Sequence, residues 1–178
     1  MMSRRVRRPT LPAVLAVLLA ALPGTIPGSN HAARAQGAMS EPTHAQPELG
    51  RQTLTIVSRG GAQHEFSVEL ARTPREQQVG EMFRTVIPAN TGMLFVWPYP
   101  QQSDMWMENC PVPEDMVFIG TDDRIQSIAE NTVPESLARI SSNGVVKATL
   151  ELQGGITAKL GIRVGDQVEN KALDAARG

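Results

Sequence analysis

Alternating apolar and polar residues predict a β-hairpin near the start of the ordered part of the chain. Apolar side chains alternate with polar ones over residues 53–56 and again over residues 65–70, and Gly60-Gly61 lies between the two runs. A period of two places alternate side chains on opposite faces of a strand, and a glycine pair permits a tight turn. We therefore expect two antiparallel strands with one buried face.

The clearest helix signal begins at Thr73. A threonine can cap the first turn, Pro74 suits the first helical position, and Glu76 completes a capping box. Apolar residues then recur at helical spacing over residues 79–83. This pattern predicts a short helix with one apolar face.

Further strands are predicted where apolar residues run together or alternate. Residues 93–97 and 116–119 are continuous apolar runs, typical of strands buried on both faces, whereas residues 146–152 alternate. Smaller apolar groups around residues 125–128 and 168 indicate two more strands, and residues 156–160 suggest a second short helix. About seven short strands with one or two short helices predict a mainly β fold, either a β-sandwich or an irregular β-barrel.

The first 35 residues resemble a secretory signal peptide. Arginines up to Arg8 precede an apolar run over residues 11–22, and Ala33-Arg34-Ala35 is a small-x-small cleavage pattern. The run is shorter than the roughly 20 apolar residues that a membrane-spanning helix needs. We expect a periplasmic or secreted protein after cleavage near Ala35, without stable membrane insertion.

The rest of the chain divides by composition into three parts. Residues 36–51 are small, polar and proline-containing, which predicts a flexible lead-in. Residues 52–170 carry all the predicted strands and form a single domain, and residues 171–178 are expected to be a flexible tail. The single cysteine excludes an intramolecular disulfide.

Charge changes the picture of the partners. Cleavage after Ala35 would remove five of the 17 basic side chains and none of the 18 acidic ones, so the net charge would become −6. Nucleic-acid binding depends on basic side chains that neutralise phosphates, so we expect no nucleic-acid partner. A small-molecule ligand remains compatible with this charge, and no protein partner is indicated.

Five segments, in this order along the chain, resemble motifs of the domain of unknown function 192 family. They read GEMFR (80–84), GMLFV (92–96), MWMENCPVPEDMVFI (105–119), LELQGG (150–155) and GIRVGDQV (161–168). The resemblance extends over residues 52–169. It implies a compact, mainly β domain, often exported or membrane-associated, and it implies no particular activity.

The sequence departs from the usual pattern of that family in the same motifs. The resemblance leads us to expect leucine where this chain has Glu81 and Glu114, and Lys-Asn-Thr where it has Glu108-Asn109-Cys110. The matching positions are Gly80, Met82, Arg84, Trp106, Met107, Asn109, Pro113 and Asp115.

The segment from Met105 to Ile119 allows three chemical interpretations, and the first is a cysteine nucleophile. Such a residue needs a thiolate, which a nearby imidazole or a helix N-terminus favours. No histidine lies near Cys110 in the sequence, and the resembling family usually has threonine there. We therefore interpret Cys110 as a small buried side chain.

The second interpretation is a Cu(I) site. Met105 and Met107 would share one face of a strand with Trp106 opposite, and thioethers favour Cu(I). No histidine accompanies the methionines, and methionine commonly fills irregular core space. We expect core packing here, and neither a metal nor a cofactor.

The third interpretation is a polar pocket. Asp115 with Glu108 or Glu114 could divide acid and base roles, which would suit an envelope hydrolase or lyase. Alternatively, Asp115 could accept backbone hydrogen bonds and pair with Arg84. Trp106 with Asn109 offers an aromatic side chain and an amide, a combination suited to small polar or carbohydrate-like ligands.

The sequence does not predict a catalytic residue, and we favour a domain without enzymatic activity. The interpretation that best joins these observations is an exported β-domain that binds a small polar or carbohydrate-like ligand. The candidate ligand-binding residues are Arg84, Trp106, Asn109 and Asp115.

Overall fold

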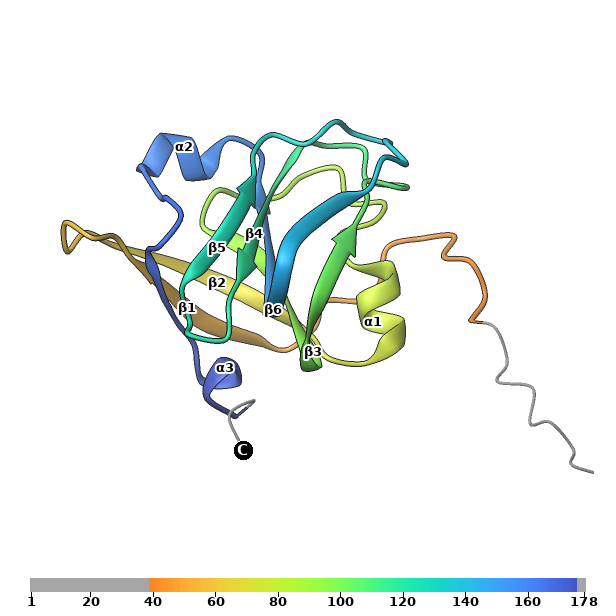
Figure 1. Ribbon diagram of the computed structural model, residues 1–178. Coiled ribbons are helices and arrows are strands. Elements are labelled where there is room, and N and C mark those ends of the chain that lie inside the picture. The colour runs from red at the N-terminus through yellow and green to blue at the C-terminus, as the bar shows by residue number, and fades with distance from the viewer. Residues whose placement is uncertain (1–38, 176–178) are drawn as a thin grey trace, which may run out of the picture. The chain divides into compact units, whose positions relative to one another are not determined.

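The computed structural model describes residues 39–175. Its short helices are placed irregularly between the strands along the chain (Figure 1). The signal peptide expected at residues 1–35 lies outside the described residues. The elements are β1 (Arg51–Val57), β2 (Gln63–Ala71), α1 (Pro74–Val79), β3 (Thr91–Met105), β4 (Glu114–Ile119), β5 (Ile125–Ala129), β6 (Ile140–Gln153), α2 (Ile156–Leu160), β7 (Gln167–Glu169) and α3 (Lys171–Ala175).

All seven strands belong to one sheet, in the order β5-β4-β6-β3-β2-β1-β7. The pair β2–β3 is parallel and the other neighbours are antiparallel. The sheet curls enough that two backbone hydrogen bonds link its end strands and the residues beside them: Ile125 N–H donates to Asp166 O at 2.9 Å, and Val168 N–H donates to Asp123 O at 2.7 Å. The predicted mainly β fold is confirmed as a half-barrel of seven strands.

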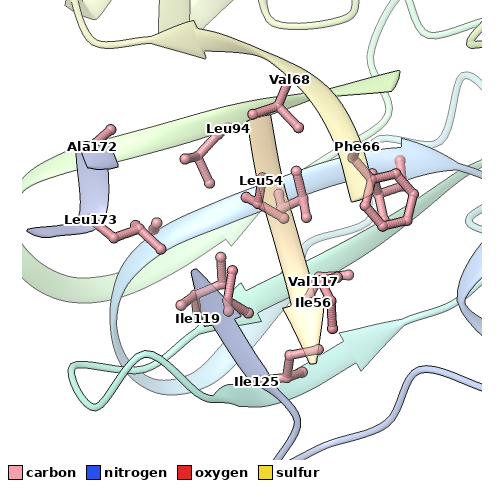
Figure 2. Close-up of a cluster of buried hydrophobic side chains, with 14 of the residues drawn as sticks. Leu54, Ile56, Phe66, Val68, Leu94, Val117, Ile119, Ile125, Ala172 and Leu173 are labelled. Atoms are coloured by element: carbon pink, nitrogen blue, oxygen red, sulfur yellow. The ribbon is translucent and has the colours of Figure 1, made fainter. Parts of the chain in front are cut away.

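The main hydrophobic core lies on one face of this sheet. Leu54, Val68, Leu94 and Val117 are completely buried there, and side chains of β1 to β5 point toward one another in Figure 2. The predicted hairpin is confirmed, since β1 and β2 pair antiparallel and bury this face. Alternation of side chains along each strand leaves a second set of residues on the opposite face.

A second apolar cluster covers the opposite face of the sheet. It contains Met116 and Phe118 of β4, which alternate with Val117 and Ile119 of the main core. A strand buried on both faces needs a covering layer on each. Here α1 and the loop after β3 supply that layer, through Val79, Met82, Met107 and Cys110.

Both ends of the described chain are more ordered than the sequence predicts. Residues Lys171–Ala175, expected to begin a flexible tail, form α3 and bury Ala172 and Leu173 in the main core. In the expected flexible lead-in, Gln46 Nε2 donates to Gly80 O at 2.9 Å and Leu49 N–H donates to Glu69 Oε2 at 2.8 Å. Distant carbonyl and carboxylate acceptors hold this segment, and local composition does not reveal them.

The strand after Gly92 is also longer than predicted. The apolar run predicts a strand over residues 93–97, but β3 includes Pro98 and Pro100 and continues to Met105. Its pairing with β6 shifts in register between Val96 and Gln101, and such an irregularity accommodates prolines in a sheet. As a result, β3 ends at Met105, directly before Trp106 in the loop that follows.

Candidate functional site

A cavity of about 230 Å³ opens between the end of α1, the outer face of β3 and the loop after β3. Both tryptophans of the chain, Trp97 and Trp106, line it, and we call it the tryptophan cavity. Other residues that line it include Phe95, Met105, Asp104, Cys110, Glu81 and Glu151. Trp106 is 53% exposed, whereas Phe95 and Glu151 are buried, so the cavity runs from the surface into the protein.

Helix α1 lies beside β3 and forms one wall of the cavity (Figure 1). Its predicted capping box is confirmed, because Glu76 N–H donates to Thr73 Oγ1 at 3.2 Å and Thr73 N–H donates to Glu76 Oε2 at 2.8 Å. The helix ends at Gly80, whose φ is 49° and ψ is −132°. A Cβ there would lie 2.9 Å from Phe95 Cζ, so glycine permits this close approach of helix and sheet.

Three buried glutamates lie beneath and beside the cavity, and we call them the carboxyl cluster: Glu81, Glu114 and Glu151. Each is less than 5% exposed. Glu151 of β6 is directly opposite Met93 of β3 and Met116 of β4. Glu114, two residues before Met116, shares this face of the sheet and is a diagonal neighbour of Glu151.

The carboxyl cluster has few hydrogen-bond donors. Among the described residues, Oε2 of Glu151 lacks a hydrogen-bond partner, and the Glu114 carboxyl interacts with no donor other than the weak Cys110 thiol. The Glu81 backbone N–H interacts with the Glu151 carboxyl, and Arg84 Nε lies 3.0 Å from Glu81 Oε2. Unsatisfied buried carboxyl oxygens are costly, so their presence beside a cavity calls for an explanation.

Burial makes these carboxyl groups hard to ionise. It raises the pKa of Glu81 to about 7, with a further increase from the charge of Glu69 and a decrease from Arg84. Burial and the nearby Glu81 charge raise the pKa of Glu114 to about 8. Burial, followed by the Glu114 and Glu81 charges, raises the pKa of Glu151 well above its usual range. Near neutral pH the cluster therefore carries fewer than three negative charges.

Cys110 lines the same cavity but is not activated as a nucleophile. Its side chain is buried, as the sequence predicts. Burial, together with the negative charges of Glu114 and Glu151, raises the pKa of the thiol far above its ordinary value. A cysteine nucleophile needs a thiolate, and these surroundings disfavour one.

Arg84, a predicted ligand-binding residue, lies behind the carboxyl cluster and does not line the tryptophan cavity. Its guanidinium donates to both oxygens of the buried Glu69, at 2.7 and 2.9 Å. Burial raises the pKa of Glu69. Hydrogen bonds from Arg84 and Leu49 and the charges of Arg84 and Arg51 lower it by more, so the pKa is below its ordinary value. Arg84 thus neutralises Glu69 and contacts the cluster only through Glu81.

Asp115, a second predicted site residue, is engaged in hydrogen bonds that hold neighbouring segments together. It is completely buried, and its carboxylate accepts hydrogen bonds from the backbone N–H groups of Asn131, Gly155 and Thr157 and from Thr157 Oγ1, at 2.6 to 2.8 Å. These bonds join β4 to the start of α2 and to the loop after β5. Asp115 does not line the tryptophan cavity.

The structure brings only one of the four predicted residues to the cavity. Trp106 lines it, while Asn109 lies in the following loop with a φ of 57° and its amide contacts Met82 Sδ at 3.9 Å. Sequence reasoning did not assign Glu151 to the site, since it occupies an ordinary alternating position in β6. The available sequence signal for the carboxyl cluster was the presence of glutamate at positions 81 and 114, where the family resemblance leads us to expect leucine.

The other two interpretations of the segment gain no geometric support. Glu114 and Asp115 are consecutive in β4, so their side chains point to opposite faces of the sheet and do not form a carboxylate pair. Met107 is completely buried in the second apolar cluster, where Thr132 Oγ1 donates to its sulfur at 3.1 Å. Within residues 39–175, no group of three histidine, cysteine or acidic side chains is arranged to hold a metal ion.

The chain matches one family model and is similar to several solved structures. The model is DUF192, described as Uncharacterized ACR, and it matches residues 55–170. One structure, from Sinorhizobium meliloti 1021 and described as a proposed transcription regulator, is 34% identical with a TM-score of 0.69 and covers 72% of this chain and 99% of its own. Another, a protein of unknown function from Novosphingobium aromaticivorans DSM 12444, is 38% identical with a TM-score of 0.68 and covers 75% of this chain and 94% of its own. No curated protein matches the sequence.

Proposed function

Since this chain belongs to the DUF192 family of domains of unknown function, we propose from its geometry that it is an exported domain that binds a small ligand in the tryptophan cavity. One observation carries the proposal: a cavity with two tryptophans in its wall lies against buried carboxyl groups, and Oε2 of Glu151 has no hydrogen-bond partner in the described chain. A mostly apolar pocket with a few converging polar groups is typical of small-molecule sites.

Binding without catalysis is the better description of this geometry. Cys110 has a strongly raised thiol pKa, and Asp115 is occupied by backbone donors. The protein would therefore hold its ligand through contact with Trp97 and Trp106 and through hydrogen bonds to the carboxyl groups.

Export is part of the proposal. The basic start, the short apolar run and the Ala33-Arg34-Ala35 pattern support cleavage near Ala35 and release into the periplasm or the medium. Among residues 39–175, no helix has the length and apolar character that would let it cross a membrane. We do not extend the transcription-regulator description of the similar structure to this chain, because an acidic chain without a basic cluster is poorly suited to DNA.

Export can be tested by expressing the full chain in a Gram-negative host and separating the periplasm from the cytoplasm. The proposal predicts a periplasmic product whose intact mass corresponds to a chain beginning just after Ala35. A full-length product confined to the cytoplasm would contradict it, and a variant with Ala33 and Ala35 replaced by bulky residues provides the matched control for cleavage.

Ligand binding can be tested by tryptophan fluorescence, because both tryptophans of the protein line the cavity. A panel of monosaccharides, amines, alcohols and carboxylic acids at millimolar concentration is titrated into the purified chain, together with Cu(I). We expect at least one organic class to give a saturable change that Trp106→Ala abolishes and that Tyr99→Ala, at an exposed position of β3 outside the cavity, leaves intact. If no organic compound of the panel gives such a change, the proposal fails.

A further inference from the structure

We propose that the ligand of the tryptophan cavity is a small organic cation, a protonated amine on a compact apolar body, held between the two tryptophans and Glu151. This inference rests on the proposed function and names the chemical class of its ligand.

The first argument is the sign of the charges around the cavity. Its titratable lining residues other than Cys110 are the acidic Glu81, Asp104 and Glu151, and no lysine or arginine lines it among the described residues. Arg84 lies behind Glu81 and is bound to Glu69, and the 73% exposed Arg139 pairs with Asp104. An anionic ligand would meet only like charges in this cavity.

The second argument is the unsatisfied oxygen of Glu151. This residue lines the cavity and is 4% exposed, and its Oε2 has no hydrogen-bond partner in the part of the chain that the structure describes. The backbone N–H of Glu81 is a nearby donor, but it already interacts with the same carboxyl group. An ammonium group brings three donors and a positive charge, so it can satisfy Oε2 and neutralise the cluster together.

The third argument is the aromatic wall. Trp97 and Trp106 both line the cavity, and Phe95 packs against Trp97 with ring centroids 6.0 Å apart and planes inclined by 36°. Tryptophan is the best aromatic partner for a cation, and the rings and Met105 also suit the apolar body of an amine. A bare metal ion would gain nothing from this wall, and the acidic groups are not arranged to coordinate one.

The raised pKa values of the cluster make a specific pH dependence part of the inference. The titratable groups that face Glu81, Glu114 and Glu151 are Arg84 after α1, Cys110 in the loop, Glu69 of β2 and Arg51 of β1. An amine binds the ionised form, so its affinity should rise with increasing pH as the carboxyl groups of the cluster lose protons. The amine itself stays protonated until about pH 10.

The test compares cyclohexylamine with cyclohexanol, which has the same ring but no charge. Both are titrated into the purified full chain at pH 8, with tryptophan fluorescence and calorimetry as readouts. We expect the amine to bind about tenfold more tightly or better, as a desolvated cation beside an aromatic ring and a carboxylate requires. Calorimetry in buffers of different ionisation enthalpy should show protons released on amine binding at pH 7.

Glu151→Gln should remove the preference for the amine and the proton release, while cyclohexanol binds the variant as it binds the unmodified chain. The matched control is Glu169→Gln, which removes one exposed carboxylate in β7. It should change neither the preference for the amine nor the proton release. Circular dichroism establishes whether each variant folds. The comparison of amine with alcohol in the unmodified chain decides the question even if Glu151→Gln does not fold.

Each outcome has a distinct meaning. Equal or tighter binding of cyclohexanol overturns the cationic ligand and leaves the proposed function intact. Absence of any response to either compound overturns this inference, while the wider panel described above decides the proposed function separately. A response to Ca²⁺ or Mn²⁺ in place of the amine also overturns it and assigns the cluster to a metal ion.

Discussion

At the scale of single residues, the most informative pair is Glu114 and Asp115, two consecutive acidic residues that are both completely buried. Asp115 accepts four hydrogen bonds, whereas the Glu114 carboxyl has only the weak Cys110 thiol as a donor among the described residues. The sequence predicts acidic residues of interest in this segment but cannot separate them, because burial depends on which sheet face each side chain reaches. Asp115 is a structural anchor, and Glu114 belongs to the carboxyl cluster.

Substitution of the two residues should therefore have opposite effects on stability. Asp115→Asn retains the shape but loses acceptors for buried N–H groups, so it should lower the free energy of unfolding by about 3 kcal/mol. Glu114→Leu replaces a buried carboxyl group that has only a weak thiol donor by an apolar side chain, and it should leave that free energy unchanged or increase it. Urea denaturation of both variants measures the difference. Strong destabilisation by Glu114→Leu with a neutral effect of Asp115→Asn would reverse the assignment.

At the scale of elements, the arrangement of α1 against β3 determines the depth of the cavity. The capping box made this helix predictable from four consecutive residues. The extension of β3 beyond Pro98 was not predictable, because its cross-strand partners in β6 lie 35 to 45 residues later in the sequence and local composition favours a loop. Residues of β3 on the far side of this irregularity, such as Asp104 and Met105, complete the cavity.

Gly80→Ala tests the close approach of α1 to the sheet. The variant needs a positive φ with a ψ of −132° and places a Cβ against Phe95, so we expect a loss of about 2 kcal/mol in the free energy of unfolding. The substitution should also lower the affinity of the cavity for its ligand. Gly60→Ala is the matched control, since no atom lies within 4 Å of its added Cβ. Equal thermal stability of the two variants would show that the approach is not constrained.

At the scale of the whole domain, curling of the sheet brings together groups from distant parts of the sequence. Glu81, Glu114 and Glu151 come from the segment after α1, from β4 and from β6. The sequence predicts the strands by their periodicity but does not specify the order β5-β4-β6-β3-β2-β1-β7, which depends on pairing between distant segments. The carboxyl cluster is a product of that order, and for this reason the sequence does not predict which residues surround Trp106.

The cluster should make the stability of the domain depend on pH. An unfolded glutamate titrates near 4.5, whereas Glu81 and Glu114 titrate near 7 and 8 in the folded chain. The folded state therefore binds more protons between these values, and the free energy of unfolding should fall as the pH rises from about 5 to 8, by on the order of a few kcal/mol. The lowered pKa values of Glu69 and Glu76 act in the opposite sense, but below pH 4.5.

Thermal or urea denaturation at several pH values measures this slope. Glu114→Gln should flatten it, because the amide does not titrate, and Glu169→Gln should preserve it. A free energy of unfolding that increases between pH 5 and 8 in the unmodified chain would mean that the glutamates are ionised in the folded state.

A crystal structure of the chain with cyclohexylamine at saturating concentration and pH 8 tests the proposed site most directly. We expect the ring between Trp97 and Trp106, with the nitrogen within hydrogen-bond distance of the Glu151 carboxylate. A bound amine at another surface, or an empty cavity under conditions where fluorescence shows saturation, would contradict it.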